Sequence, residues 1–197
     1  MSGEASVQRE ESIRWKNVSD RSGRKRGEGT MLRLRPFKAC DAKAVVSWIG
    51  DEEAFYKWSA GRLGEYPITA EGLNRYYDSF AYDDRFFVMA AYDEDGIAGQ
   101  VMMRFLDEEK KELRFGFIIV NNSIRGKGYG KQMLKLAAKY AFEILKAEHV
   151  TLGVFENNEP ACRCYKAAGF RETGRVETYS ILAAEWKCEE LELRPLV

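Results

Sequence analysis

The stretch that decides the fold runs Val120-Asn121-Asn122-Ser123-Ile124-Arg125-Gly126-Lys127-Gly128-Tyr129-Gly130. Before it, residues 111–120 are rich in β-branched and aromatic side chains, which predicts a strand. After it, apolar residues recur at helical spacing from Gly130 to Lys146, which predicts a helix. The quoted stretch is therefore a glycine-rich loop that joins a strand to the first turn of a helix.

This arrangement predicts a site for an anion. The first N–H groups of a helix have no partner inside the helix, and they carry the positive end of the helix dipole. Gly126, Gly128 and Gly130 allow the backbone to approach a bound group closely. Arg125 and Lys127 add positive charge that reaches phosphate oxygens. We interpret the loop as a site for a phosphate group, and in particular for a pyrophosphate.

The composition of the 197 residues excludes several classes of protein. The 31 Lys and Arg residues balance the 31 Asp and Glu residues, so no net charge recruits nucleic acid or an anionic membrane. No apolar run reaches the length of a membrane span and no secretion signal precedes the chain, so we expect a cytoplasmic protein. The four cysteines, Cys40, Cys162, Cys164 and Cys188, show no spacing typical of a disulfide-rich protein or of a zinc site. Because the chain has only one histidine as a further ligand, we predict no metal site.

Residues 1–30 differ from the rest of the chain. They contain few aliphatic side chains and no steady period, so they bury too little surface to offset the entropy of ordering them. We predict a disordered tail over residues 1–30 and one folded domain over residues 31–197. The basic run within 21–26 is interpreted as a solvated part of that tail.

The order of elements in residues 31–197 predicts the fold class. Strands 86–92, 97–106 and 111–120 are joined by tight turns and form an antiparallel meander. The helix that follows the glycine loop brings strand 149–155 parallel beside strand 111–120. The other expected elements are a first strand at 31–35, helices near 42–49, 51–58, 70–80 and 159–168, and final strands near 170–179 and 186–193. We expect Asp41, Thr69 and Asn158 to cap the first, third and last of these helices. The expected fold class is α/β (α+β), a mixed, mostly antiparallel central sheet flanked by helices.

The glycine loop alone does not identify a ligand. A phosphate loop of the Walker A type needs Gly-Lys-Ser or Gly-Lys-Thr, which is absent here. The dinucleotide fingerprint also fits poorly, because the third glycine lies at the wrong spacing and the strand before the loop is not the first of a doubly wound sheet.

A second stretch, Asn158 to Phe170, adds the missing information. Together the two stretches resemble the GNAT superfamily of N-acetyltransferases. The pyrophosphate motif of that family, Arg/Gln-x-x-Gly-x-Gly/Ala, is matched by Arg125, Gly128 and Gly130. Its later motif, Asn-x-x-Ala-x-x-x-Tyr-x-x-x-Gly-Phe, is matched by Asn158, Ala161, Tyr165, Gly169 and Phe170. The order of elements also agrees, so the resemblance covers residues 31–194.

The resemblance implies an enzyme that binds acetyl-coenzyme A (acetyl-CoA) and transfers its acetyl group to a primary amine by direct attack in a ternary complex. The pyrophosphate would bind the loop, and the pantetheine arm would pair like an extra strand where strands 111–120 and 149–155 splay apart. In the family a bulge opens this gap, and we expect it at Gly116 or just after. The implied cofactor-binding residues are Val120, Arg125, Gly126, Lys127, Gly128, Tyr129, Gly130 and Asn158.

The resemblance also implies catalytic positions. The backbone N–H of Ile118 would stabilise the oxyanion that develops on the acetyl carbonyl. Tyr165 would protonate the departing thiolate. The Glu that many family members use as a general base aligns with Arg114, so this chain departs from the pattern. Glu112, on the same face of the strand, is our candidate for a base acting through water, and an amine that arrives neutral would need none.

The acceptor amine stays open at this point, as a small molecule, a protein N-terminus or a lysine. The resemblance places its pocket within residues 51–80 and 176–186, where acidic residues either attract a cationic amine or suit helix starts. Monomer and homodimer are both open. The alternative function is a CoA-binding sensor or interaction module that has lost turnover, which Arg114 favours and Tyr165 disfavours.

Overall fold

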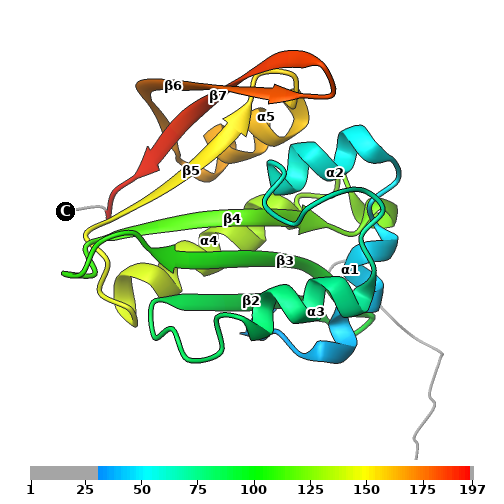
Figure 1. Ribbon diagram of the computed structural model, residues 1–197. Coiled ribbons are helices and arrows are strands. Elements are labelled where there is room, and N and C mark those ends of the chain that lie inside the picture. The colour runs from blue at the N-terminus through cyan, green and yellow to red at the C-terminus, as the bar shows by residue number, and fades with distance from the viewer. Residues whose placement is uncertain (1–30, 196–197) are drawn as a thin grey trace, which may run out of the picture.

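Seven strands and five helices make up residues 31–195, the part of the chain that the computed structural model describes (Figure 1). The strands are β1 (Arg33–Pro36), β2 (Phe86–Asp93), β3 (Gly96–Phe105), β4 (Glu112–Val120), β5 (His149–Phe155), β6 (Arg171–Ile181) and β7 (Ala184–Leu193). The helices are α1 (Ala42–Ser47), α2 (Glu52–Ser59), α3 (Ala70–Asp78), α4 (Tyr129–Glu143) and α5 (Glu159–Ala168), with short 3-10 turns at Ala39–Asp41 and Asn122–Ile124. The predicted tail, residues 1–30, lies outside the described residues.

The strands form one sheet in the order β1-β2-β3-β4-β5-β7-β6. Only β4 and β5 run parallel, and every other pair of neighbours is antiparallel. The crossover between the parallel pair is the connection through the glycine loop and α4. The predicted mixed, mostly antiparallel sheet is therefore confirmed, together with the order of its elements.

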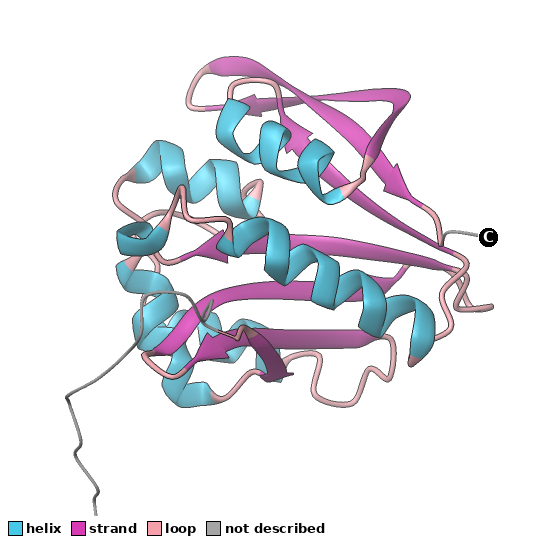
Figure 2. Cartoon of the chain, turned by 180° about the vertical axis from the view of Figure 1, so that it is seen from behind, coloured by secondary structure: helices cyan, strands magenta, loops and turns pink. Residues whose placement is uncertain are grey.

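Helices cover both faces of the sheet. Helices α4 and α5 lie across the face seen in Figure 2, and α1, α2 and α3 lie on the face that Figure 1 turns toward the viewer. We call these the α4 face and the α1 face. The core on the α4 face includes Phe115 and Leu134, and the core on the α1 face includes Val45, Leu73 and Ile119. Each such side chain contributes about 1.5–3 kcal/mol by leaving water.

Side-chain caps fix where two helices on the α1 face begin. Thr69 accepts a hydrogen bond of 3.0 Å from the backbone N–H of Gly72, as the sequence predicts. Asp51 accepts one of 2.7 Å from the N–H of Ala54 and so starts α2. These bonds satisfy N–H groups that the helix itself leaves without a partner.

The prediction that Asp41 caps the first helix is wrong. Asp41 precedes α1, but its side chain accepts no bond from that helix. Its carboxylate accepts hydrogen bonds from Arg35 Nη1 (2.6 Å), from Arg35 Nη2 (2.8 Å) and from the N–H of Lys38 (2.8 Å). Burial alone raises the pKa of Asp41, but the bonds from Arg35 and Lys38 outweigh burial and lower it below its usual value. The contact ties β1 to the chain that enters α1.

We therefore predict that Asp41→Asn destabilises the fold. Near neutral pH the free energy of unfolding should fall by about 1–3 kcal/mol, because Arg35 loses its charged partner. A carboxyl whose pKa is lowered by folding stabilises the fold above its unfolded pKa of about 3.9, and it loses this effect as the pH falls through the folded value. Denaturant unfolding should show the difference between variant and wild type shrinking as the pH is lowered from 5 toward 3.

A surface variant, Asp78→Asn, serves as the control and should stay within about 0.5 kcal/mol of the wild type. Equal unfolding free energies for wild type and Asp41→Asn at pH 7 would show that the Arg35 contact contributes nothing.

Candidate functional site

A β-bulge interrupts β4 in the middle of the sheet. Gln100 of β3 pairs with Ile119, and Met102 pairs with Gly116. Phe117 and Ile118 therefore both oppose the single residue Val101. Phe117 has a φ of 47°, a left-handed conformation that few residues other than glycine adopt. The bulge lies directly after Gly116, where the sequence predicts it.

The bulge changes the face of the sheet toward which the alternate residues of β4 point. Phe115 packs in the core of the α4 face. Phe117 instead contacts the rings of Trp58 and Tyr76 on the α1 face, each at a centroid distance of 5.5 Å. Gly116 makes room for this change, because a Cβ there would lie 2.7 Å from Met102 Cε. A larger residue at position 116 would have to displace the end of the Met102 side chain.

The pairing between β4 and β5 stops just before the bulge. It runs from Glu112–His149 to Phe115–Leu152, and no further residue of the two strands is paired. Beyond that point β5 stays paired with β7 up to Phe155, so it follows β7 away from β4 (Figure 1). The predicted splay is confirmed. It leaves Ile118 and Val120 without a partner in β5, which is the arrangement that an added extended chain recognises.

The glycine loop continues directly from the open end of β4. Gly126 and Gly128 have φ values of 77° and 83°, and Gly128 is the residue before the first turn of α4. A Cβ at Gly130 would lie 2.9 Å from Cys164 Sγ, so the small residue lets α4 approach α5 closely. The N-terminus of α4 therefore lies beside α5 and next to the gap, as an anion site at this place requires.

Charged and polar side chains surround the loop. Arg125 and Lys127 are exposed, and Arg125 Nε donates to the carbonyl oxygen of Val120 at 3.3 Å. Helix α4 begins at Tyr129, one residue earlier than predicted. The Tyr129 hydroxyl donates to Asp93 Oδ2 at 2.7 Å, so this side chain anchors the loop to the end of β2.

Tyr165 lies on α5 with only 8% of its surface exposed. Burial raises the pKa of its hydroxyl, which therefore stays protonated over the whole physiological range. Within residues 31–195 two side-chain polar atoms are sealed from solvent without a partner, Trp58 Nε1 and Gln100 Oε1. The Tyr165 hydroxyl is not one of them, and no hydrogen bond joins it to another described residue.

The prediction that the side chain of Asn158 caps α5 is wrong. Asn158 occupies the capping position through its backbone, whose carbonyl accepts from the N–H of Cys162 at 3.1 Å. Its side chain makes no capping bond, and it is half-buried. The amide group therefore keeps its hydrogen-bonding capacity at the start of α5.

The two charged residues on the paired half of β4 have partners. Glu112 accepts a hydrogen bond of 2.8 Å from the Thr151 hydroxyl and lies 3.8 Å from His149 Nε2. It pairs with β5 at the closed end of the gap, and six residues of strand separate it from Ile118, about 20 Å. This distance removes the geometric support for Glu112 as a base.

Arg114 forms an ion pair of 2.8 Å with Glu190 of β7 and reaches across β5 to do so. A Cβ at Gly153 would lie 3.0 Å from the Arg114 guanidinium, so the side chain passes closely over that strand. Arg114, which the resemblance aligns with a general base, therefore links β4 to β7 through an ion pair.

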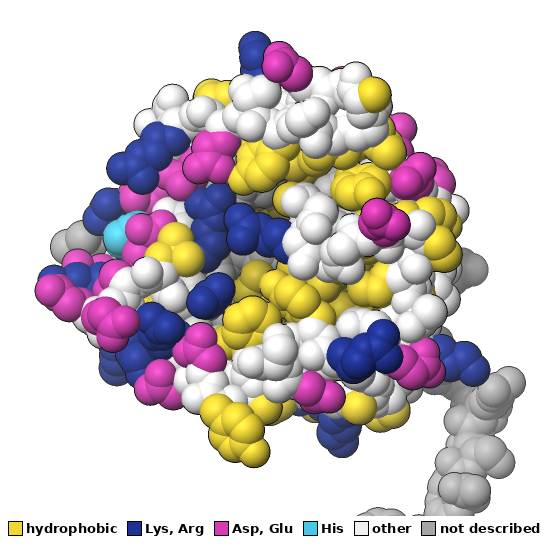
Figure 3. All heavy atoms as spheres, viewed as in Figure 1, with side chains coloured by type: hydrophobic (Ala, Val, Ile, Leu, Met, Phe, Trp, Pro, Cys, Tyr) yellow, Lys and Arg dark blue, Asp and Glu magenta, His cyan; other side chains and the backbone are white. Residues whose placement is uncertain are grey.

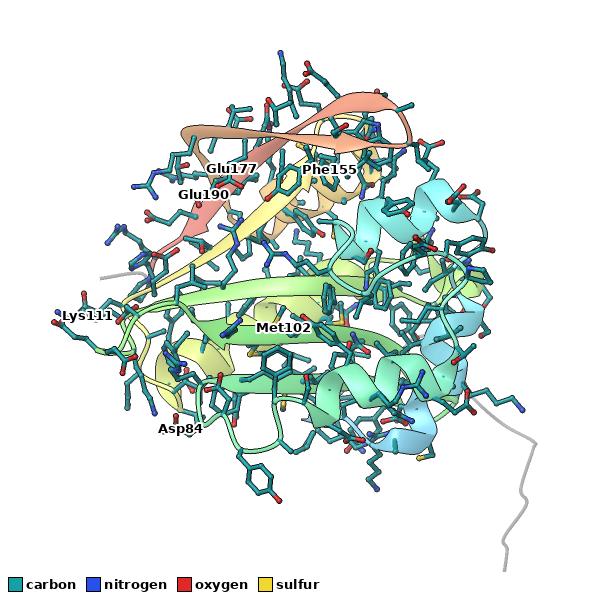
Figure 4. All side chains as sticks on the ribbon, viewed as in Figure 1. Asp84, Met102, Lys111, Phe155, Glu177 and Glu190 are labelled. Atoms are coloured by element: carbon teal, nitrogen blue, oxygen red, sulfur yellow. The ribbon has the colours of Figure 1, made fainter. Side chains whose placement is uncertain are left out.

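Aromatic side chains flank the gap on the α1 face. Trp58 and Tyr76 stand on one side, and Phe155 packs against Tyr179 (5.5 Å) and Trp186 (5.3 Å) on the other. Figure 3 shows this face hollowed near its centre, with hydrophobic and basic side chains gathered there. In Figure 4, Phe155 and Glu177 lie on one side of the gap and Met102 on the other. Of these side chains, Trp58, Tyr76, Glu177, Tyr179 and Trp186 lie in the two segments in which the sequence predicts the acceptor pocket, whereas Met102 and Phe155 lie outside them.

The sequence predicts no metal site, no membrane span and no disulfide framework, and the structure bears on these points for the described residues alone. No group of three His, Cys, Asp or Glu side chains within 31–195 has an arrangement that could hold a metal ion. In the same range no helix has the length and apolar character needed to cross a membrane. All four cysteines are free thiols.

Sequence reasoning missed Gln100. It is fully buried on β3, and its Nε2 donates to the Tyr77 hydroxyl (2.6 Å) and to the carbonyl of Phe117 (3.3 Å). A signal was present, because Gln100 is the one polar side chain in the run from Ile97 to Met103. Buried polar groups are costly unless bonded, so such a residue indicates a specific partner.

Comparison with known proteins agrees with this geometry. Residues 51–170 match the profile of the acetyltransferase (GNAT) family. The spermine/spermidine N(1)-acetyltransferase of Bacillus subtilis (strain 168) is 34% identical over 87 residues, which are 44% of this chain and 49% of that protein. The SPbeta prophage-derived uncharacterized N-acetyltransferase YokL of the same organism is 26% identical over 112 residues, 56% of this chain and 62% of that protein. The chain thus spans about half to three fifths of the length of these curated relatives.

A solved structure shares the fold. The spermidine N-acetyltransferase from Vibrio cholerae, in complex with CoA and spermine, superposes with a TM-score of 0.70. The alignment covers 83% of this chain and 95% of that chain at 21% identity, which is evidence for the fold alone. The family match, in contrast, spans more than half of the sequence and includes both the glycine loop and α5, so the chain belongs to the GNAT family of acetyltransferases.

Proposed function

We propose that the chain is an N-acetyltransferase, with acetyl-CoA as its co-substrate and a primary amine as its acceptor. The observation that carries the proposal is the gap between β4 and β5, which opens where the bulge ends their pairing. The gap offers strand backbone to an arm that itself contains amide groups. The glycine loop at the end of β4 offers N–H groups and positive charge to the pyrophosphate of the same molecule.

Each part of acetyl-CoA has a proposed partner. Residues 125–130 bind the pyrophosphate, and the N-terminus of α4 favours its negative charge. The backbone of Val120 pairs with the pantetheine arm, and the Asn158 amide, which caps nothing, is the proposed side-chain contact to it. In this role Arg125 releases the Val120 carbonyl and turns to the phosphates.

Ile118 and Tyr165 supply the chemistry. The amine nitrogen attacks the acetyl carbonyl, a C–N bond forms, and the C–S bond then breaks. The N–H of Ile118 stabilises the negative charge that develops on the carbonyl oxygen. Tyr165, which burial keeps protonated, donates its proton to the leaving sulfur and regains one from the attacking nitrogen, which loses a proton as the amide forms. The amine must lose a proton before attack, and because Glu112 is distant we propose that this proton passes to solvent.

The acceptor is proposed to be a small molecule. The Bacillus relative is named for spermine and spermidine, which makes these polyamines the first acceptors to test. Two acidic residues of the predicted pocket segment already have partners within the protein, since Asp51 caps α2 and Glu53 pairs with Lys57 at 2.7 Å. A protein N-terminus or a lysine is the other acceptor class, and free thiols are compatible with a cytoplasmic location.

An assay of thiol release tests the activity directly. Wild-type protein with acetyl-CoA and a panel of amines should release CoA and form the acetylated amine, with rates that rise with pH as the amine loses its proton. The panel contains spermine, spermidine, simple monoamines and peptides with a free N-terminus or lysine. Binding of acetyl-CoA without turnover on any amine would instead support a CoA-binding sensor.

We predict that Tyr165→Phe lowers the turnover number by about 10²–10⁴-fold, the range typical of a lost general acid. The ring and its packing stay, so the affinity for acetyl-CoA and the melting temperature should change little. Because burial raises the pKa of the hydroxyl, the wild type should show no loss of turnover from Tyr165 ionisation below pH 10. Steady-state kinetics over pH 6–10 and calorimetry measure these quantities.

Tyr140→Phe is the matched control, because Tyr140 is half-buried on α4 and has no proposed contact with substrate. Unchanged turnover in Tyr165→Phe would assign the proton transfer to water. Loss of acetyl-CoA binding would make Tyr165 a packing residue.

A further inference from the structure

A buried amide stands directly behind the bulge. Gln100 has no exposed surface, and its side chain lies on the α1 face, where it contacts the Tyr77 hydroxyl. Its two Nε2 protons have two acceptors, Tyr77 Oη at 2.6 Å and the carbonyl oxygen of Phe117 at 3.3 Å. Gln100 is thus the side chain that bonds the backbone of the bulge itself.

The peptide bond that Gln100 contacts also contains the proposed oxyanion donor. The carbonyl of Phe117 and the N–H of Ile118 belong to one planar, trans peptide unit, so they point in opposite directions. A carbonyl held on the β3 side by Gln100 directs the N–H of Ile118 away from β3. The neighbour of β4 on the side away from β3 is β5, which is no longer paired with β4 at Ile118. The N–H of Ile118 therefore points into the gap between β4 and β5.

We infer that Gln100 is a positioning residue, which aims the Ile118 N–H at the acetyl carbonyl by holding the Phe117 carbonyl. The inference rests on the proposed N-acetyltransferase function, because only a reacting carbonyl in the gap gives that N–H a catalytic task. Gln100 touches neither substrate nor the reacting atoms. Its effect is exerted through the orientation of one peptide plane.

Tyr77 supports this amide from the other side. Its ring lies between α3 and the sheet and packs edge-on against Phe37 at 5.2 Å. Burial raises the pKa of its hydroxyl well above the usual value, so the hydroxyl stays neutral and does not ionise beside the amide. Because one nitrogen serves both acceptors, loss of the Tyr77 hydroxyl frees the Gln100 amide to turn away from Phe117.

The test compares Gln100→Met with the wild type. Met has nearly the same length and volume but no donor, so the core stays filled while the Phe117 carbonyl loses its partner. A misaimed oxyanion donor lowers the rate of reaction by about 10²-fold. Turnover should fall by that factor. The dissociation constant of acetyl-CoA, measured by calorimetry, should stay within about threefold of the wild-type value, because the lost contact forms only in the transition state.

Two further variants separate positioning from packing. Met103→Leu changes a buried residue of the same strand that faces the α4 side, and its turnover should match the wild type. Tyr77→Phe should lower turnover in the same direction as Gln100→Met but less, and it carries the test if Gln100→Met does not fold. Equal turnover of the wild type, Gln100→Met and Tyr77→Phe overturns the inference, as does a variant that folds like the wild type but loses cofactor affinity together with turnover.

A second readout does not depend on turnover. Amide hydrogen exchange at Ile118, followed by nuclear magnetic resonance, should slow when acetyl-CoA binds the wild type and should slow much less in Gln100→Met. If the wild type acetylates no amine, the proposed function fails, and this exchange measurement alone decides the role of Gln100. Identical protection of Ile118 in both proteins overturns the inference.

Discussion

The peptide unit between Phe117 and Ile118 divides β4 into an end that is paired with β5 and an end that is not. A left-handed φ at a residue with a side chain costs on the order of 1–3 kcal/mol, and it persists only where its surroundings hold it. Here Trp58 and Tyr76 hold the ring of Phe117, and Gln100 holds its carbonyl. The bulge reverses the faces of the strand, so one end of β4 packs against α4 and the other against the helices of the α1 face.

The sheet is joined at one end of the β4–β5 pair and open at the other. Four residue pairs, from Glu112–His149 to Phe115–Leu152, connect its two halves, and the ion pair from Arg114 to Glu190 adds a tie over β5. The open end receives the glycine loop from β4. Close contact of Gly130 with Cys164 then sets that loop against α5, the helix that carries Tyr165. The anion site and the proposed acid are therefore placed by the same packing.

The order of the elements and the bulge could be predicted because their signals are local or belong to the family pattern. Gly116 marks the bulge, which the structure places directly after it, and Gly126 and Gly128 mark the loop, where both residues have a positive φ. Side-chain partners were harder to predict. Asp41 is bonded to Arg35, a contact that outweighs its local capping preference, and the side chain of Asn158 caps nothing. The role of Gln100 depends on side chains of α3, β3 and β4 that meet only in the folded protein, so no local sequence pattern indicates it.

A crystal structure of the protein with acetyl-CoA tests the central claim most directly. The account predicts that the pantetheine arm lies between β4 and β5 and pairs with the backbone of Val120. The acetyl carbonyl oxygen should lie about 2.7–3.1 Å from the Ile118 nitrogen, with the Phe117 bulge unchanged. An arm bound outside the gap, or a β4 that straightens and pairs with β5 beyond Phe115, would contradict the account.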